Sequence, residues 1–302
     1  MAKDLLNKSL LTLAPSHFKE YSLIDSGNGS KLERFGKIVT IRPEPQAVWA
    51  PSLPVEEWQN RADVQFIPTS SNSGKWKKIK PVDDKWTISY SGSVSFRFIL
   101  SLTGFKHVGI FPEQAVNWEY IASNIKKLRQ KFKEPDFLNL FAYTGGASLA
   151  ARAAGAKVTH VDSIKQVITW ANENMRLSGL SDIRWVVEDA LKFVRREARR
   201  GNKYHGIILD PPAYGHGPEG EKWKLEEKIL EMMNTVQQIL HEGNCFLILN
   251  AYSLGFSALI LENLIDEKFR KKNFESGELY VMDEFGKKLP LGAFVRFSNL
   301  SS

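Results

Sequence analysis

The 302-residue chain is predicted to adopt an α/β fold, in which a small β-rich domain precedes a parallel sheet. Strand-like and helix-like segments alternate up to about residue 269, which is typical of a parallel sheet with right-handed crossovers. Residues 1 to about 85 instead hold short β-favouring pieces between turn-forming residues. We therefore assign residues 1–90 to an N-terminal β-rich domain and residues 91–302 to the α/β domain.

The N-terminal segment has four β-favouring pieces, at residues 21–24, 36–42, 64–67 and 86–89, and half of the tryptophans. One of these, Trp76, lies among four lysines, which are Lys75, Lys77, Lys78 and Lys80. Two interpretations remain open. Either the tryptophans compensate for a thin core, or Trp76 stacks on single-stranded RNA while the lysines neutralise the RNA phosphates.

The α/β domain is predicted to begin with a covering helix, residues 114–131, and a βαβ unit. An apolar strand, residues 137–141, stops at a glycine turn that opens an Ala-rich helix, residues 147–154. The next strand, residues 157–161, delivers Asp162 at its carboxyl end. Glycines let the backbone approach a ligand, and an acid at the next strand tip can accept both ribose hydroxyl hydrogens. The unit therefore indicates a nucleotide-type cofactor, although the absence of G-x-G-x-x-G and G-K-[ST] disfavours a dinucleotide or an NTP.

Two further strands are predicted to end on acids. After a helix at residues 165–177, a third strand ends at Glu188 and Asp189. The short apolar strand at residues 204–209 has the composition of a central strand buried on both faces. It runs into Asp-Pro-Pro-Ala-Tyr, residues 210–214, where the two prolines hold a rigid extended elbow. A polar side chain at the carboxyl end of a strand, with an aromatic ring just beyond it, suits the binding of a planar amine or base as a nucleophile.

The sheet is predicted to be completed by three more strands. The fifth strand covers residues 245–249. Residues 277–282 and 289–297 have strand character and are expected to pair as an antiparallel hairpin.

Four motifs, taken in order and spacing, resemble one family. They are Asn-Leu-Phe-Ala-Tyr-Thr-Gly-Gly at 139–146, Val-Asp-Ser at 161–163, Glu-Asp-Ala at 188–190 and Asp-Pro-Pro-Ala-Tyr at 210–214. The chain resembles class I S-adenosylmethionine-dependent methyltransferases and, more narrowly, the bacterial 23S rRNA methyltransferase group with a leading β-rich domain. The resemblance covers roughly residues 105–300, including the lead-in Lys-His-Val-Gly-Ile-Phe-Pro-Glu-Gln at 106–114. It implies a Rossmann-like seven-stranded sheet and S-adenosylmethionine as cofactor.

The resemblance implies that the glycine turn binds the methionine part of the cofactor. The backbone of Tyr143, Thr144 and Gly145 would lie under this part. The Thr144 hydroxyl would add a contact to the methionine carboxylate or ammonium. Gln114 is expected either to reach the pocket from the lead-in segment or to cap the following helix.

The resemblance also implies how the nucleoside part is held. Asp162 would accept the ribose hydroxyl hydrogens, with Ser163 beside it. Asp189 would bind the adenine amine, with the Ala190 amide alongside, although Glu188 is an adjacent competitor for this role.

Residues 210–214 are expected to hold the substrate. Asp210 would accept a hydrogen bond from a substrate amine or ring nitrogen, and the Pro211 carbonyl would be a second acceptor. Pro212 completes the rigid elbow, and Tyr214 would stack on a base that has been unstacked into the pocket.

Several other polar residues have weaker assignments. Asn250 and Tyr252, after the fifth strand, are candidates for the floor of the substrate site. His216 is interpreted either as a general base or as an exposed residue of a loop that covers the substrate. His107 and His160 are expected to be structural.

The chain departs from the family at its only cysteine. Members that make 5-methylcytosine use a cysteine nucleophile just beyond the fifth strand, because carbon 5 must be activated by covalent addition. Here Cys245 begins that strand and is expected to face the core. We therefore expect a direct transfer to nitrogen or oxygen, in which the protein mainly positions an already activated methyl group.

The formal net charge of +7 is unevenly distributed. Three basic clusters occur, formed by Lys126, Lys127, Arg129, Lys131 and Lys133, by Arg195, Arg196, Arg199, Arg200 and Lys203, and by Lys268, Arg270, Lys271 and Lys272. Each cluster alone is compatible with a solvated helix face. Together, beside a methyltransferase pocket, they favour a polyanionic substrate such as RNA.

The remaining features limit the classes of protein to which the chain can belong. One cysteine excludes a disulfide framework within the chain and a multi-thiolate metal site, so no metal is expected. We expect no signal peptide, no membrane span and a cytoplasmic location. Two rival functions remain, which are methylation of a small molecule or protein and a non-catalytic RNA-binding role with a vestigial cofactor fold. The oligomeric state is not predicted.

Overall fold

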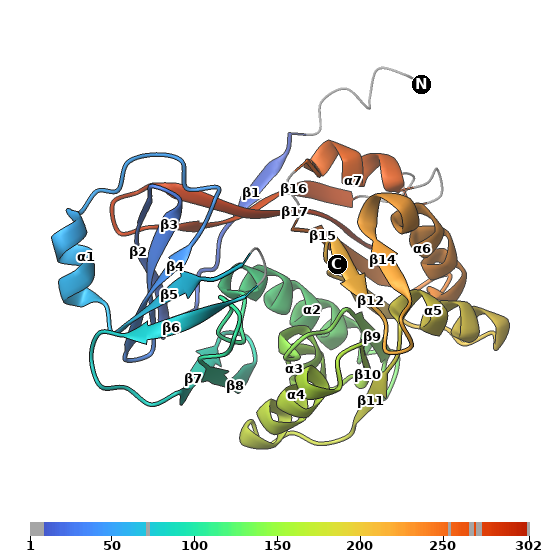
Figure 1. Ribbon diagram of the computed structural model, residues 1–302. Coiled ribbons are helices and arrows are strands. Elements are labelled where there is room, and N and C mark those ends of the chain that lie inside the picture. Colours follow the sequence, from blue (N-terminus) through green and yellow to red (C-terminus); the bar gives the residue numbers. More distant parts are fainter. Residues whose placement is uncertain (1–8, 71–72, 253–254, 266–268, 270–273, 301–302) are drawn as a thin grey trace.

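The computed structural model describes residues 9–70, 73–252, 255–265, 269 and 274–300. Its largest sheet has eight strands in the order β1-β16-β17-β15-β12-β9-β10-β11 (Figure 1). Their bounds are β1 (Leu11–Leu13), β9 (Asp136–Leu140), β10 (Lys157–Asp162), β11 (Ile183–Val187), β12 (Gly206–Leu209), β15 (Phe246–Ala251), β16 (Phe274–Met282) and β17 (Lys288–Ser298). β17 is antiparallel to both of its neighbours, whereas the other pairs are parallel. This arrangement confirms the predicted α/β fold.

The sheet has one strand more than the seven that were predicted. The additional strand, β1, pairs in parallel with β16 at the sheet edge. Gly277 permits this pairing, since a Cβ atom at this position would lie 1.8 Å from the carbonyl oxygen of Leu11. The predicted seven strands did not include β1 because three residues give too little periodicity to indicate a strand.

Helices cover both faces of the large sheet (Figure 1). α2 (Ala115–Leu128), α3 (Gly146–Ala153) and α4 (Lys165–Leu177) contribute to one apolar core, together with Phe137 of β9. The other face has its own core, which Leu138 of the same strand enters. Its helices are α5 (Ala190–Arg199), α6 (Leu225–Ile239) and α7 (Ala258–Leu264). The alternation of side chains along buried β9 therefore divides the domain into two cores.

The N-terminal region forms a five-stranded sheet and a hairpin. The sheet order is β2-β3-β4-β5-β6, and β7 and β8 pair separately. The bounds are β2 (Tyr21–Gly27), β3 (Ser30–Phe35), β4 (Ile38–Pro43), α1 (Val55–Arg61), β5 (Val64–Pro68), β6 (Gly74–Lys78), β7 (Lys85–Ser91) and β8 (Ser95–Ser101). The four β-favouring pieces all fall within this region's strands, apart from two residues at the start of the second piece.

The long β16–β17 hairpin extends from the large sheet to the N-terminal sheet (Figure 1). Asp283, at the tip of the hairpin, forms a β-bridge with Leu23 and accepts a hydrogen bond from the Ser26 hydroxyl at 3.0 Å. Lys287 donates to the Ala50 carbonyl at 2.9 Å. The two sheets are thus joined by backbone and side-chain contacts as well as by the chain connection.

Trp76 packs inward, with its ring centroid 5.2 Å from that of Phe66. The indole N–H groups of Trp49, Trp58 and Trp86 donate hydrogen bonds within the protein, whereas that of Trp76 is buried without a partner among the described residues. Two of the nearby lysines are paired, Lys78 with Asp84 and Lys80 with Asp63. For Trp76, the structure therefore supports the core interpretation over base stacking.

Three short elements lie near the carboxyl ends of the central strands of the large sheet. These are the short 3₁₀ helix η1 (Pro112–Gln114) and the strands β13 (Tyr214–His216) and β14 (Lys222–Lys224), which form a small hairpin. Among the described helices, none is long and apolar enough to cross a membrane.

Candidate functional site

A cavity of about 460 Å³ opens at the carboxyl ends of the central strands. It is lined by all twelve residues predicted from the sequence, namely Gln114, Tyr143, Thr144, Gly145, Asp162, Ser163, Asp189, Ala190, Asp210, Pro211, Pro212 and Tyr214. Ligands bind at this edge in open α/β sheets, because the loops after neighbouring strands meet there.

The turn after β9 holds two non-glycine residues in the left-handed region. Phe141 has a φ of +57° and Tyr143 a φ of +49°, followed by Gly145 at +93°. Such conformations cost about 1–3 kcal/mol each and persist only where the surroundings enforce them. Here the Thr144 hydroxyl donates to the Gly109 carbonyl at 2.6 Å, and the Asn174 side chain donates to the Thr144 carbonyl at 3.0 Å. The turn leaves the strand one residue earlier than predicted, after Leu140.

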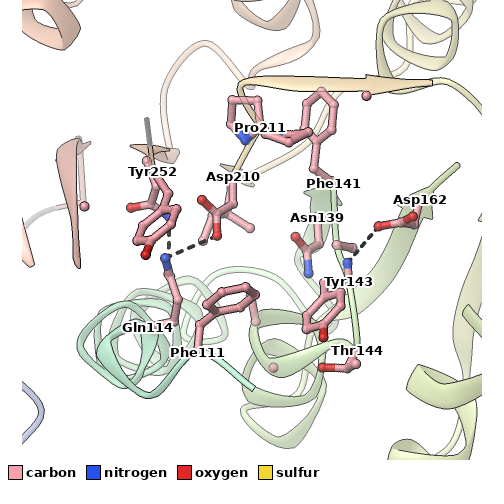
Figure 2. A pocket seen from close by; sticks show the side chains of 18 of the residues that line it. Phe111, Gln114, Asn139, Phe141, Tyr143, Thr144, Asp162, Asp210, Pro211 and Tyr252 are labelled. Carbon is pink, nitrogen blue, oxygen red and sulfur yellow. Dashed lines mark hydrogen bonds between the residues drawn. The ribbon is translucent and has the colours of Figure 1, made fainter. Parts of the chain in front are cut away.

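Asp162 fixes this turn to the end of β10. One carboxylate oxygen accepts the Tyr143 N–H at 2.9 Å (Figure 2), and the other accepts the Ile164 N–H at 3.0 Å. Burial raises the pKa of Asp162, although these backbone donors oppose the shift. Each oxygen retains a lone pair that can accept a hydroxyl hydrogen. Ser163 follows directly and also lines the cavity.

The acids after β11 have different partners. Asp189 caps α5, with one carboxylate oxygen accepting the Lys192 N–H at 2.8 Å, and it is nearly buried. Ala190 is the first residue of that helix. Glu188 is drawn into an ion pair with Arg196, whose guanidinium lies 2.6 Å away. Of the two acids, Asp189 is the one with an oxygen open to a ligand, since its second carboxylate oxygen has no partner among the described residues.

Gln114 joins the lead-in segment to the end of β12. Its side chain does not cap α2. Instead its amide nitrogen donates to Asp210 at 3.2 Å (Figure 2). Its amide oxygen accepts from Asn117 at 2.9 Å and from Asn250 at 3.2 Å. Burial raises the pKa of Asp210 to about 7. Gln114 thus reaches the pocket and orients the carboxylate that the sequence assigned to the substrate.

The proline elbow leads into the β13–β14 hairpin. The Pro212 carbonyl accepts the Trp223 indole N–H at 2.7 Å, which anchors the elbow to β14. Within the described part of the chain, no donor reaches the Pro211 carbonyl. Tyr214 is 52% exposed, and its hydroxyl lies 3.0 Å from the His216 Nε2 atom. The two side chains therefore form an exposed pair that lines the cavity.

Sequence reasoning missed several aromatic residues of the site. Phe111 lies between His107 and Tyr143, with ring-centroid separations of 4.9 Å and 5.3 Å. The Phe141 ring packs on Trp223 at 4.8 Å. These residues come from separate segments, so no local pattern indicates that they meet. Asn250 and Tyr252 line the cavity as expected, although Asn250 lies within β15 rather than after it.

Glu113 was also missed, although it lies in the quoted lead-in segment. Its side chain is only 3% exposed and lines the cavity. Glu113 directly follows the apolar run Ile-Phe-Pro, and this position was the available signal.

Cys245 and His160 lie away from the cavity. Cys245 precedes β15 and is buried at the amino end of the strand, opposite the edge where the cavity opens. The His160 ring is buried below the turn, with its Nδ1 atom 3.0 Å from the Ser148 hydroxyl. Neither side chain is among those that line the cavity.

The residues around the cavity fit S-adenosylmethionine. A carboxylate stands at the end of each of the three strands β10, β11 and β12, where Asp162, Asp189 and Asp210 line one continuous space. Gly145 lines the same space, and its φ of +93° is a backbone conformation that residues with a side chain rarely adopt. The donor set is made of oxygen and amide groups and suits an amino acid, a ribose and an adenine ring.

Comparison with protein families supports this interpretation. Residues 122–249 match the family described as Conserved hypothetical protein 95. The ribosomal RNA large subunit methyltransferase K/L of Shewanella frigidimarina is 33% identical over 148 residues, which cover 48% of this chain and 20% of that protein. The enzyme of the same name from Buchnera aphidicola is 25% identical over 237 residues, or 71% of this chain and 33% of that protein. The chain thus spans only a fifth to a third of these curated relatives.

Solved structures extend the similarity over nearly the whole chain. A fold neighbour at 17% identity, the putative methyltransferase SMU.776 complexed with SAH, has a TM-score of 0.70 over 93% of this chain and 76% of that chain. The SAM-dependent methyltransferase from Agrobacterium tumefaciens is 39% identical, with a TM-score of 0.88, and the match covers 96% of this chain and 93% of that one. The chain belongs to the class I S-adenosylmethionine-dependent methyltransferases, with S-adenosylmethionine as its cofactor.

Proposed function

We propose that this protein methylates a base nitrogen of RNA, with ribosomal RNA as the expected substrate. The observation that carries this proposal is Asp210, which Gln114 holds as an acceptor beside the Pro211 carbonyl in the cofactor cavity. The curated relatives are named ribosomal RNA methyltransferases, which supports the substrate class. A ribosomal RNA substrate would place the reaction in the cytoplasm.

The cofactor would be held by residues from three strand ends. We assign its methionine part to the backbone of Tyr143, Thr144 and Gly145 and its ribose to Asp162, with Ser163 adjacent. The adenine amine is assigned to the unpartnered oxygen of Asp189, beside the Ala190 amide. Thr144 already donates to the Gly109 carbonyl, so its hydroxyl would serve the cofactor as an acceptor only. Gln114 would bind Asp210 rather than the cofactor directly.

The chemistry requires positioning more than activation. When bound, S-adenosylmethionine supplies a sulfonium methyl group that is already activated. Asp210 and the Pro211 carbonyl would orient the attacking nitrogen so that its lone pair faces this methyl group. Transfer to the substrate nitrogen would form the new C–N bond and break the C–S bond, whose electrons would remain on sulfur. The nitrogen then loses one proton, which Asp210 is placed to accept.

The basic clusters support an RNA substrate less than their number suggests. In the second cluster, three arginines are paired with acids: Arg195 with Glu231, Arg196 with Glu188 and Arg200 with Glu197. The third cluster lies outside the described residues. Lys75 and Lys77 on β6 are exposed and carry no ion pair among the described residues. We therefore assign phosphate contacts to these two lysines before the arginine cluster.

The function can be tested on ribosomal RNA from a strain that lacks the protein. Purified protein with radiolabelled S-adenosylmethionine should methylate this RNA but not RNA from the parent strain, whose target is already modified. Mass spectrometry of the nucleosides would then identify the modified base. Methylation should weaken steeply between low and moderate salt, because phosphate contacts release counterions. Transfer to a protein or small molecule, at a rate insensitive to salt, would contradict the proposal.

A further inference from the structure

Five carboxylic side chains line the cavity, and four of them have hydrogen-bond partners from other residues. The exception is Glu113. It is nearly buried, and no hydrogen bond from another described residue reaches its carboxyl group. A buried polar group without a partner is costly and rare, so it calls for a specific explanation. An open position for a ligand atom would supply one.

Glu113 lies toward the substrate half of the cavity. The charged groups that act on it are Lys31 and Glu33 of β3 and Asp210 after β12, and it acts in turn on Tyr21 of β2 and on Tyr252 after β15. Neither Asp162 nor Asp189 is among these groups. Glu113 also directly precedes Gln114, whose side chain donates to Asp210, so it lines the cavity from the segment that contacts the group assigned to the substrate nitrogen.

The neighbouring cation does not neutralise Glu113. Lys31 lies 3.2 Å from Glu44 and 3.6 Å from Glu33, so its charge is already shared by two carboxylates. Burial raises the pKa of Glu113 to about 8, and the charges of Asp210 and Glu33 act in the same direction. At neutral pH the carboxyl group therefore keeps its proton, and a protonated carboxyl group is a hydrogen-bond donor. Asp210 differs, because the Gln114 amide donates to it and favours its ionised form.

Building on the proposed function, we propose that Glu113 contacts the target base as a neutral acid and donates a hydrogen bond to an unprotonated ring nitrogen. Asp210 accepts from the amine beside that nitrogen. This donor and acceptor pair matches a base edge with an exocyclic amine next to a ring acceptor, which cytosine, adenine and guanine present. Uracil has no exocyclic amine and would leave Asp210 without a partner.

The experiment compares Glu113→Gln, Glu113→Leu and the control Glu119→Gln. Glutamine keeps a donor at position 113, whereas leucine keeps only the volume and the fold. Glu119 lies on α2 and accepts from Tyr90 and Ser93 outside the cavity, so it controls for the loss of a carboxylate in the same segment. Each protein is assayed for methyl transfer to ribosomal RNA from the deletion strain and, by calorimetry, for S-adenosylmethionine affinity.

Glu113→Gln should retain kcat/KM within about tenfold of the wild type, while Glu113→Leu should lose about 10- to 100-fold because a substrate acceptor stays unpaired. Cofactor affinity should stay unchanged in both. The wild-type rate should fall above about pH 8, where Glu113 ionises and ceases to donate, and this fall should be absent from Glu113→Gln. The methyl group should appear on an exocyclic amine.

Three results would overturn this proposal while leaving the proposed function intact. These are equal loss in the glutamine and leucine variants, weakened cofactor binding in both, and a methyl group on a ring N–H position instead of an exocyclic amine. Wild-type protein that binds S-adenosylmethionine but methylates no RNA would overturn the proposed function and this inference together.

Discussion

Asp162 has two roles that a single substitution would remove together. Its carboxylate holds the Tyr143 amide in a left-handed turn and stands where a ribose is expected. Asp162→Ala should therefore reduce S-adenosylmethionine affinity by about 100-fold or more, since hydrogen bonds to charged groups contribute about 1.5–3 kcal/mol each. Calorimetry in one buffer measures the effect, with the exposed Asp83→Ala as the matched control. Unchanged affinity in a folded Asp162→Ala protein would place the cofactor elsewhere.

Asp210 should affect the transfer step more than cofactor binding. Because its pKa is raised to about 7, the ionised form that accepts a proton is present above this pH and is lost below it. The wild-type single-turnover rate should therefore rise with pH through about 7. Asp210→Asn should lower that rate by about 100- to 1,000-fold and remove this rise. A variant that retains the wild-type rate and pH profile would exclude Asp210 as the acceptor.

At the scale of elements, β1 depends on one close backbone approach. Gly277→Ala would place a methyl group against the Leu11 carbonyl, so β1 should detach from β16 while the rest of the sheet stays folded. Amide hydrogen exchange should then show lost protection at residues 11–13. Gly104→Ala is the control, because a Cβ atom there would meet nothing within 4 Å. Protection that survives in Gly277→Ala would mean that the edge can shift to accommodate a side chain.

At the scale of the whole molecule, the N-terminal region supports the cavity as well as its own sheet. Phe18, Tyr21 and Phe35 share one core with Trp118 of α2 and Leu289 of β17. Tyr252 lines the cavity, and its hydroxyl donates to Glu44 of the N-terminal region at 3.2 Å.

A fragment of residues 91–302 should therefore expose part of this core and lose both thermal stability and cofactor affinity. Differential scanning calorimetry of the fragment and the full chain would test this expectation. A fragment that unfolds cooperatively and binds S-adenosylmethionine as the full chain does would instead support the predicted boundary near residue 90 as that of an independent domain.

The sequence alone predicted seven of the eight strands of the large sheet, in their order along the chain, and the acids that follow three of them. Parallel strands that are buried on both faces are runs of apolar residues, which can be recognised in a sequence. The carboxyl ends of such strands meet at one edge of the sheet, so Asp162, Asp189 and Asp210 could be predicted to lie together there. The tertiary structure decided what has no local pattern. β1 pairs with the sheet where Gly277 allows a close backbone approach, and the Trp76 ring packs against Phe66. Gln114 donates to Asp210, which lies 96 residues further along the chain. Glu113 also became notable only in the fold, because an unpaired carboxyl group is defined by the partners that surround it.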